Sequence, residues 1–253
     1  MSATQHNSLQ NALVNPIFCA LDSVNVADVV AMAQAIKPHV GGIKLGLEFY
    51  LANGADGYKR VAETGVPIFL DLKFHDIPNT VAGAVRAVAP LAPSIITIHT
   101  QGGTEMMRRA ADTAAEEADR HGVEKPIVAG VTVLTSLDDQ DLSATGVQDP
   151  VINQVPRLAA LAHASGLDGM VCSPQEIELA RQATSDDFTL IVPGIRPAGS
   201  AKGDQKRVLT PQEAVAKGAN VLVIGRPISQ SENPAKAAAD IAQSIVTPAT
   251  IIN

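Results

Sequence analysis

Short runs of apolar, β-branched residues recur along the whole chain, and their spacing limits the folds that it can adopt. Each run is apolar at almost every position, as expected of a strand buried on both faces of a parallel sheet. Ala-rich amphipathic stretches lie between the runs and predict helices, at roughly 30 residues per strand–helix unit. The predicted strands cover residues 16–22, 41–46, 66–73, 94–100, 126–135, 166–173, 188–196 and 220–227.

Eight strands alternating with helices predict an α/β fold, the (β/α)8 or TIM barrel. We expect one domain over residues 1–253, with a polar tail at 1–15. An open doubly wound sheet is the alternative, but no G-x-G-x-x-G follows the first strand. The clearest helical stretches cover 26–37, 80–91, 103–120 and 156–165, and two long loops, 136–149 and 197–209, are candidate lids.

Composition excludes several classes of function. The net charge is −7, and no basic run or aromatic–basic interleaving indicates a nucleic-acid partner. No apolar stretch reaches the roughly 18 residues that a membrane span needs, and the polar N-terminus lacks the apolar segment of a signal peptide. Cys19 and Cys172 lie in apolar runs and are predicted to be buried free thiols. The sequence therefore predicts a cytoplasmic protein.

Charged residues lie at or near the ends of three consecutive predicted strands. The first strand ends in Asp22, the second carries Lys44, and the third carries Asp71 and Lys73. Side chains at i and i+2 of a strand face the same way, so the last two should project together into the barrel mouth. A self-satisfied ion-pair network is the structural alternative. Burying four alternating charges is a poor way to gain stability, so the pattern favours a functional site.

The seventh and eighth predicted strands run into two similar turns, at the end of the barrel where many barrels of this kind bind phosphate. They read PGIRP at 193–197 and IGRP at 224–227, and Gln205 lies in the loop after the first. Gly225 lets the backbone approach a ligand closely, and Arg226 can offer a planar fork to an oxyanion. The pair of turns predicts a phosphate site.

Other polar residues near the strand ends are less specific. Thr135 ends the fifth strand and can contact a small polar ring, although a local turn or helix cap explains it nearly as well. His75 is interpreted as a structural or supporting neighbour of the charged cluster, and His99, at the end of the fourth strand, as a histidine of the core or mouth rather than a ligand. No His and carboxylate set has metal-ligand spacing, so no metal is expected.

The stretch DLKFHDIPNT at 71–80 resembles the D-x-K-x-x-D-I-x-x-T signature of the orotidine 5′-monophosphate decarboxylase family, in its bacterial form. The resemblance extends over about 16–245, because further segments stand in the family's order. These are ALD (20–22), GIKLG (42–46), VTVLTS (131–136), VPGIRP (192–197) and IGRP (224–227).

This resemblance implies a role for each matching residue. Lys73 is similar to the lysine that protonates C6 of the pyrimidine as CO2 leaves, and Asp71 to the carboxylate beside the substrate carboxylate. Lys44 and Asp22 match positions that contact the ribose and complete the charge array. The remaining matches are Thr135 and Pro193 beside the pyrimidine, and Arg196, Gln205, Gly225 and Arg226 at the phosphate.

The same resemblance implies a homodimer with shared sites, because Asp76, Ile77 and Thr80 match residues that reach the ribose and the charge array of the partner subunit. It also implies a reaction without a cofactor. A fixed ammonium at C6 stabilises the carbanion that is left by CO2 and then supplies the proton. Asp71 either stresses the substrate carboxylate electrostatically or holds Lys73 protonated and aimed.

Three alternatives remain open at the level of the sequence. A metal-dependent sugar-phosphate aldolase or decarboxylase of the same barrel group would share the D-x-K-x-x-D core. A Schiff-base enzyme would use Lys73 as its nucleophile, although the nearby Asp71 disfavours a neutral amine. A nucleotide-binding regulator would bind without catalysis.

Overall fold

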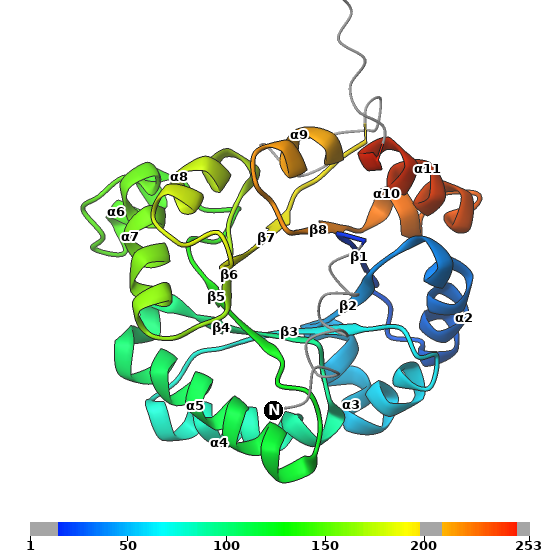
Figure 1. Ribbon diagram of the computed structural model, residues 1–253, viewed down its shortest axis with the longest axis horizontal. Helices are drawn as coiled ribbons and strands as arrows, with labels where there is room; N and C mark the ends of the chain where they lie inside the picture. Colours follow the sequence, from blue (N-terminus) through cyan, green and yellow to red (C-terminus); the bar gives the residue numbers. More distant parts are fainter. Residues whose placement is uncertain (1–14, 198–208, 247–253) are drawn as a thin grey trace, which may run out of the picture.

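The predicted strands form a closed parallel barrel, which confirms the (β/α)8 fold (Figure 1). The structure is a computed structural model that describes residues 15–197 and 209–246. Each strand pairs with the next along the chain, and β8 pairs with β1. The helices surround the barrel as a ring (Figure 1). The predicted tail except Asn15, the predicted site residue Gln205 and most of the 197–209 loop lie outside the described residues.

The strands are short, as is usual in such barrels. Their bounds are β1 (Ile17–Ala20), β2 (Gly42–Gly46), β3 (Ile68–Phe74), β4 (Ile95–His99), β5 (Ile127–Val131), β6 (Gly169–Val171), β7 (Thr189–Pro193) and β8 (Val221–Ile224). The helices are α2 (Val26–Ile36), α3 (Leu47–Ala62), α4 (Pro78–Val88), α5 (Gly103–His121), α6 (Asp139–Ala144), α7 (Val151–Ala164), α8 (Ile177–Gln182), α9 (Pro211–Ala216), α10 (Arg226–Ser229) and α11 (Pro234–Val246).

Two apolar layers hold the barrel together. The inner layer fills the barrel with side chains that include Phe18, Phe69 and Ile95. The outer layer packs the other face of the strands against the helices, and Leu70 belongs to it. Since strand side chains alternate between faces, Asp71 lies on the inner face two residues beyond Phe69. Polar groups at strand ends therefore sit above an apolar floor.

Two helices differ in detail from the sequence-based expectation. Helix α3 lies where a helix between two predicted strands is expected, but it is not one of the clearest helical stretches, because its glycines lower helix propensity and Gly54, at a kink inside it, has a positive φ of 60°. Burial of Phe49, Tyr58 and Val61 overrides that propensity. Helix α7 begins at Val151 and carries Pro156 inside it, whereas the prediction began at that proline.

The predicted loop at 136–149 also differs, since it contains the short helix α6. Asp138 caps this helix by accepting hydrogen bonds from the backbone N–H groups of Gln140 and Asp141. The Asp141 carboxylate accepts a bond from the backbone N–H of Asp138 in return. This reciprocal pair is the local signal that fixes the start of the helix.

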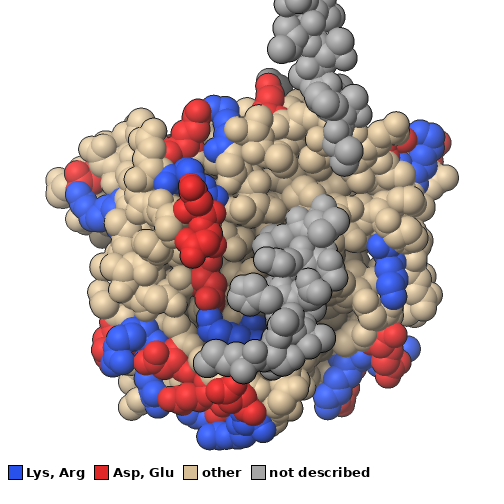
Figure 2. Space-filling model, in the orientation of Figure 1, with Lys and Arg blue, Asp and Glu red and all other residues tan. Residues whose placement is uncertain are grey.

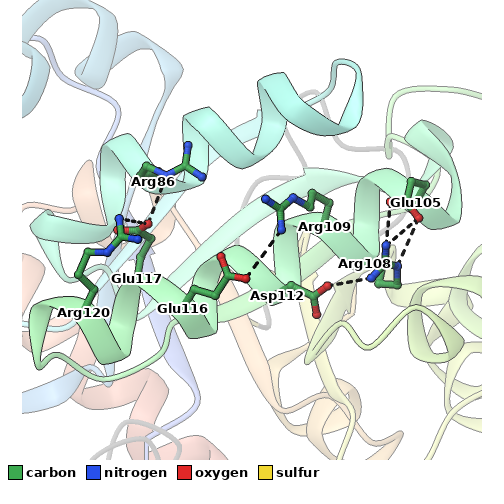
Figure 3. A network of polar contacts seen from close by, with 8 residues as sticks. All are labelled: Arg86, Glu105, Arg108, Arg109, Asp112, Glu116, Glu117 and Arg120. Atoms are coloured by element: carbon green, nitrogen blue, oxygen red, sulfur yellow. Dashed lines mark hydrogen bonds and ion pairs between the residues drawn. The ribbon is translucent and has the colours of Figure 1, made fainter.

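Helices α4 and α5 are joined by a network of charged side chains (Figure 3). Its centre is Glu117 of α5, whose side chain is 1% exposed. The Glu117 Oε1 lies 3.2 Å from the Nε of Arg86 on α4 and 2.7 Å from the Nη1 of Arg120. Figure 2 shows charges of both signs interspersed over this pair of helices, at the lower left. The pairing clamps α4, which starts beside the barrel mouth, to its neighbour.

Candidate active site

The ends of β1, β2 and β3 bring the four predicted charges together at the barrel mouth. The Lys44 Nζ lies 3.8 Å from the Asp22 Oδ1 and 3.6 Å from the Asp71 Oδ2. The Lys73 Nζ lies closer, 2.8 Å from the same oxygen of Asp71. Asp71 is 9% exposed, whereas the Asp22 side chain is largely open to solvent. The array is thus anchored on one buried carboxylate with two ammonium groups around it.

The strand that carries Asp71 and Lys73 is not regular, although simple alternation of side chains had been expected. Its pairing with β4 is broken between Leu70 and Phe74, and Lys73 has a positive φ of 51°. Such a conformation is uncommon for a residue with a Cβ and is held only where the surroundings impose it. The bulge therefore sets the direction from which the Lys73 side chain leaves the backbone.

Thr97 of β4 is a residue that sequence reasoning missed. It is fully buried, and its hydroxyl donates a hydrogen bond to the Asp71 Oδ1 over 2.8 Å. The hydroxyl oxygen of Thr97 also accepts a bond from the backbone N–H of Lys73 over 3.0 Å. A signal was available, because Thr97 is the polar residue two positions after the inward-facing Ile95.

Opposing effects set the ionisation of Asp71. Burial disfavours its charged form, but the ammonium groups of Lys44 and Lys73 favour it, together with the hydrogen bonds from Lys73 and Thr97. The ammonium groups and the hydrogen bonds prevail over burial and hold the pKa of the Asp71 carboxyl below its usual value. Asp71 is therefore an anion at neutral pH, despite its burial.

Two cavities open at the mouth and share the residues Lys44, Pro193 and Val223. The larger has a volume of about 640 Å³ and is lined by Asp22, Arg196, Gly225 and Arg226, among others. The smaller has a volume of about 170 Å³ and holds Asp71, Lys73 and Thr135 against apolar walls. The apolar wall of the smaller cavity consists of Phe69, Val131, Val133, Leu134, Val171, Cys172, Ile191, Pro193 and Val223.

Most of the predicted phosphate-end residues line the larger cavity, from the ends of β7 and β8. Arg196 follows β7 and is 9% exposed, and its backbone N–H donates to the Leu209 carbonyl over 3.0 Å. Gly225 and Arg226 follow β8, and the Arg226 side chain is exposed. Pro193 ends β7 between the two cavities.

The residues after Lys73 leave the cluster. Asp76, Ile77 and Thr80 lie at the start of α4 and line neither cavity of their own chain, and Ile77 is well exposed. The Asp76 Oδ1 accepts a hydrogen bond from the backbone N–H of Ile77 over 2.7 Å. Within the described part of the chain no ion pair links Asp76 to Lys44 or Lys73. The structure therefore separates this segment from the four-charge array.

The two histidines near the cluster contact each other. The rings of His75 and His99 have centroids 5.3 Å apart. Burial, together with His75 and the Lys73 ammonium, lowers the pKa of His99 below its usual value. A neutral His99 at neutral pH adds no charge beside Lys73.

The remaining expectations concern membranes, metals and thiols. Within residues 15–197 and 209–246, no helix is long and apolar enough to cross a membrane. No group of three or more His, Cys, Asp or Glu side chains in those ranges has the geometry to hold a metal ion. Cys19 and Cys172 are buried and free, as predicted, and burial raises the pKa of Cys19 to about 12.

Comparison with known proteins gives a consistent result. The model of the "Orotidine 5′-phosphate decarboxylase / HUMPS" family matches residues 15–241. Orotidine 5′-phosphate decarboxylase of Rhodospirillum rubrum is 55% identical over 233 residues, which are 92% of this chain and 94% of that protein. The enzyme of the same name from Paramagnetospirillum magneticum is 52% identical over 229 residues, 90% of this chain and 97% of that protein.

A solved structure agrees with these relatives. The crystal structure of orotidine 5′-phosphate decarboxylase from Lactobacillus acidophilus superposes with a TM-score of 0.81. It is 34% identical in sequence, and the match covers 92% of this chain and 100% of that one. Sequence and fold thus point to the same relatives over nearly the whole described chain.

Proposed function

This chain belongs to the orotidine 5′-phosphate decarboxylase / HUMPS family, and from that premise we propose that the four-charge array at the barrel mouth is its catalytic site. The protein removes CO2 from orotidine 5′-monophosphate and releases uridine 5′-monophosphate (UMP), a step of pyrimidine biosynthesis. The observation that carries the assignment of the site is the Lys73 ammonium, held 2.8 Å from Asp71 at the edge of a small apolar cavity.

Lys73 has the central chemical role in this proposal. The bond between C6 and the carboxylate breaks, and its electron pair remains on C6, where the ring cannot delocalise it. The fixed ammonium stabilises this charge as it develops and then gives C6 a proton, and the resulting amine is reprotonated from water. Asp71 holds the ammonium in place, and Lys44 adds a second positive charge beside the same carboxylate.

The two cavities accommodate the two halves of the nucleotide. The smaller one has apolar walls and the Lys73–Asp71 pair at its edge, which suits a pyrimidine ring with Thr135 and Pro193 beside it. The larger one suits the ribose, contacted by Asp22 and Lys44, and the phosphate, bound at Gly225, Arg226 and Arg196. Gln205 is proposed to join the phosphate end from the loop outside the described residues.

Binding energy from the phosphate has a purpose beyond affinity. For so slow an uncatalysed reaction, the protein must supply the upper part of the roughly 8–23 kcal/mol range of transition-state stabilisation. One ammonium is insufficient for that. Contacts with the phosphate contribute if they are coupled to assembly of the charged site around the pyrimidine.

The proposed assembly is a homodimer with shared sites. Asp76, Ile77 and Thr80 line neither cavity of their own chain, and Ile77 is 68% exposed. An exposed apolar side chain next to a carboxylate is a suitable element to reach a partner's site across an interface. We also propose a cytoplasmic location, which the two free, buried thiols support.

A decarboxylation assay tests this function directly. The purified protein should cause the ultraviolet absorbance of orotidine 5′-monophosphate to fall, and the rate should be the same with and without EDTA. Absence of the absorbance change in folded protein, or its loss on adding EDTA, would contradict the proposal.

The second candidate is a metal-dependent sugar-phosphate aldolase or decarboxylase of the same barrel group. Two observations support this candidate. The D-x-K-x-x-D pattern at 71–76 is shared within that barrel group, and the matching family is named for HUMPS proteins as well as for the decarboxylase. The same assay separates the two candidates, since the second requires a metal and EDTA would then abolish activity.

A further inference from the structure

Three residues of β3 face a single residue of β4 at the catalytic array. Leu70 pairs with Ile96, and the next pair along the strands is Phe74 with Ile98. The residues 71–73 therefore lie opposite Thr97 alone. A bulge of this size leaves backbone groups without their usual partner in the strand ladder and turns the following side chain.

The Thr97 hydroxyl compensates for the broken ladder. It accepts a hydrogen bond from the backbone N–H of Lys73, the residue with the positive φ of 51°. A buried N–H group without a partner is costly, so this bond stabilises the bulged conformation directly. The Thr97 side chain on β4 thus replaces a backbone acceptor at the position where β3 departs from regular geometry.

The same hydroxyl also fixes the carboxylate. A threonine hydroxyl has one hydrogen to donate, and here it goes to the Asp71 Oδ1 over 2.8 Å. The other oxygen of that carboxylate, Oδ2, remains for the Lys73 Nζ. The Thr97 hydroxyl therefore holds both residues of the catalytic pair at once, through the carboxylate of Asp71 and the backbone N–H of Lys73.

We infer that Thr97 is a positioning residue for decarboxylation, which aims the Lys73 ammonium at C6 by fixing the Asp71 carboxylate and the bulge at Lys73. This inference rests on the proposed function. Thr97 lines neither cavity, so it acts through its two neighbours rather than on the substrate. Positioning errors of this kind affect the chemical step more than the binding of the nucleotide.

Three substitutions separate the hydroxyl from the packing of the side chain. Thr97→Val keeps the volume and removes the hydroxyl, Thr97→Ser keeps the hydroxyl and removes a methyl group, and Thr97→Ala removes both. Thr100→Val is the matched control, because Thr100 is equally buried and its hydroxyl donates to the Val131 carbonyl over 2.8 Å rather than to the array.

Steady-state kinetics with orotidine 5′-monophosphate, UMP binding and melting temperature are measured for the wild type and the four variants. The loss of a hydrogen bond to a charged group predicts that Thr97→Val and Thr97→Ala lower kcat by about 10- to 100-fold. Their KM and their affinity for UMP should change by less than about threefold, since nucleotide contacts are retained. Thr97→Ser should keep kcat within about threefold of the wild type, because its hydroxyl makes the same bonds.

Each result has a defined meaning. Wild-type kinetics in Thr97→Val and Thr97→Ala, or equal losses in Thr97→Ser and Thr97→Ala, would overturn the positioning role, the second because packing alone would then explain it. If Thr97→Val does not fold, the Ser and Ala pair still decides. A wild-type protein that does not decarboxylate the nucleotide would instead refute the proposed function, whatever the variants do.

Discussion

The Nζ of Lys73 lies 2.8 Å from the Oδ2 of Asp71, although the strand between the two residues is bulged rather than regular. The contact satisfies part of the buried carboxylate and leaves the ammonium, whose side chain is 30% exposed, open towards the small cavity. An ammonium with one fixed partner and one open side can meet a developing negative charge without reorganising.

Replacement of Lys73 by Ala should therefore abolish turnover and leave nucleotide binding intact. Loss of both the electrostatic stabilisation and the proton donor predicts a fall in kcat of at least about 10⁴-fold. UMP should still bind, because the larger cavity is unchanged. The measurements are the absorbance assay and a UMP titration by calorimetry.

Lys125→Ala is the control for this substitution. Lys125 also pairs with an aspartate, Asp168, and its side chain has a similar exposure of 34%. Lys125 precedes β5 and Asp168 precedes β6, so this pair lies at the opposite end of the barrel from the array. The kcat of this variant should equal that of the wild type. A kcat that falls in Lys73→Ala by much less than about 10⁴-fold would remove Lys73 from the chemical step.

The depressed pKa of Asp71 predicts how its contribution to stability varies with pH. The carboxyl ionises more easily in the folded protein than in the unfolded chain, where its pKa is about 3.9. Its charge therefore stabilises the fold fully above that value, and this stabilisation is lost as the pH falls through the lower folded pKa. The difference in unfolding free energy between wild type and Asp71→Asn should be constant above about pH 5.

Below about pH 4 the free energy of unfolding of the wild type should fall relative to that of Asp71→Asn. The reason is that the Asp71 carboxyl binds a proton in the unfolded chain in this range, while in the folded protein it stays ionised to lower pH. The amide of the variant does not titrate in either state. Urea unfolding of both proteins at several pH values gives the comparison. A relative stability of the wild type that rises as the pH falls would mean that burial, rather than the two ammonium groups, controls Asp71.

The sequence was sufficient to predict the barrel and most of the array, for identifiable reasons. Strands buried on both faces are apolar at nearly every position, so their runs are visible without an alignment. Asp22, Lys44 and Asp71 interrupt or end such runs, and parallel neighbouring strands necessarily bring their ends together. Only the order of strands in the barrel was needed to convert three separate positions into one site.

Other features depend on contacts that the local pattern does not encode. The positive φ of Lys73 arises from a mismatch between two strands, and no property of the residues 71–73 alone indicates it. The role of Thr97 is not recognisable from the sequence, because a lone threonine in a strand is ordinary and gains this role only from the bulge opposite. Helix α3 formed despite its glycines because its apolar face is buried.

The position of Asp76 outside its own chain's cavities leads to a test of the shared site. If Asp76 completes the partner's site, mixing the inactive Lys73→Ala and Asp76→Ala proteins should restore activity. A mixed dimer would contain one site with both residues intact, so random exchange of subunits predicts recovery of about a quarter of the wild-type rate. The absorbance assay is run after exchange has been demonstrated with differently tagged subunits. Exchange without recovery would place Asp76 in its own subunit's site.

The buried carboxylate of Glu117 should matter for stability and not for catalysis (Figure 3). Glu117→Gln keeps the shape but loses the charge-assisted bonds from Arg86 and Arg120, which predicts a loss of about 1–3 kcal/mol in unfolding free energy. Glu116→Gln is the matched control, because Glu116 is 54% exposed and lies 3.8 Å from Arg109.

For the Glu116 variant, an exposed pair predicts a change below about 0.5 kcal/mol. Urea unfolding at pH 7 measures both, and kcat should stay at the wild-type value because neither residue lines either mouth cavity. The exposed ends of Arg86 and Arg120 can turn to water in the variant, which limits the loss at Glu117. Equal stability of the two variants would show that the buried charge costs as much in lost hydration as the two guanidinium groups return.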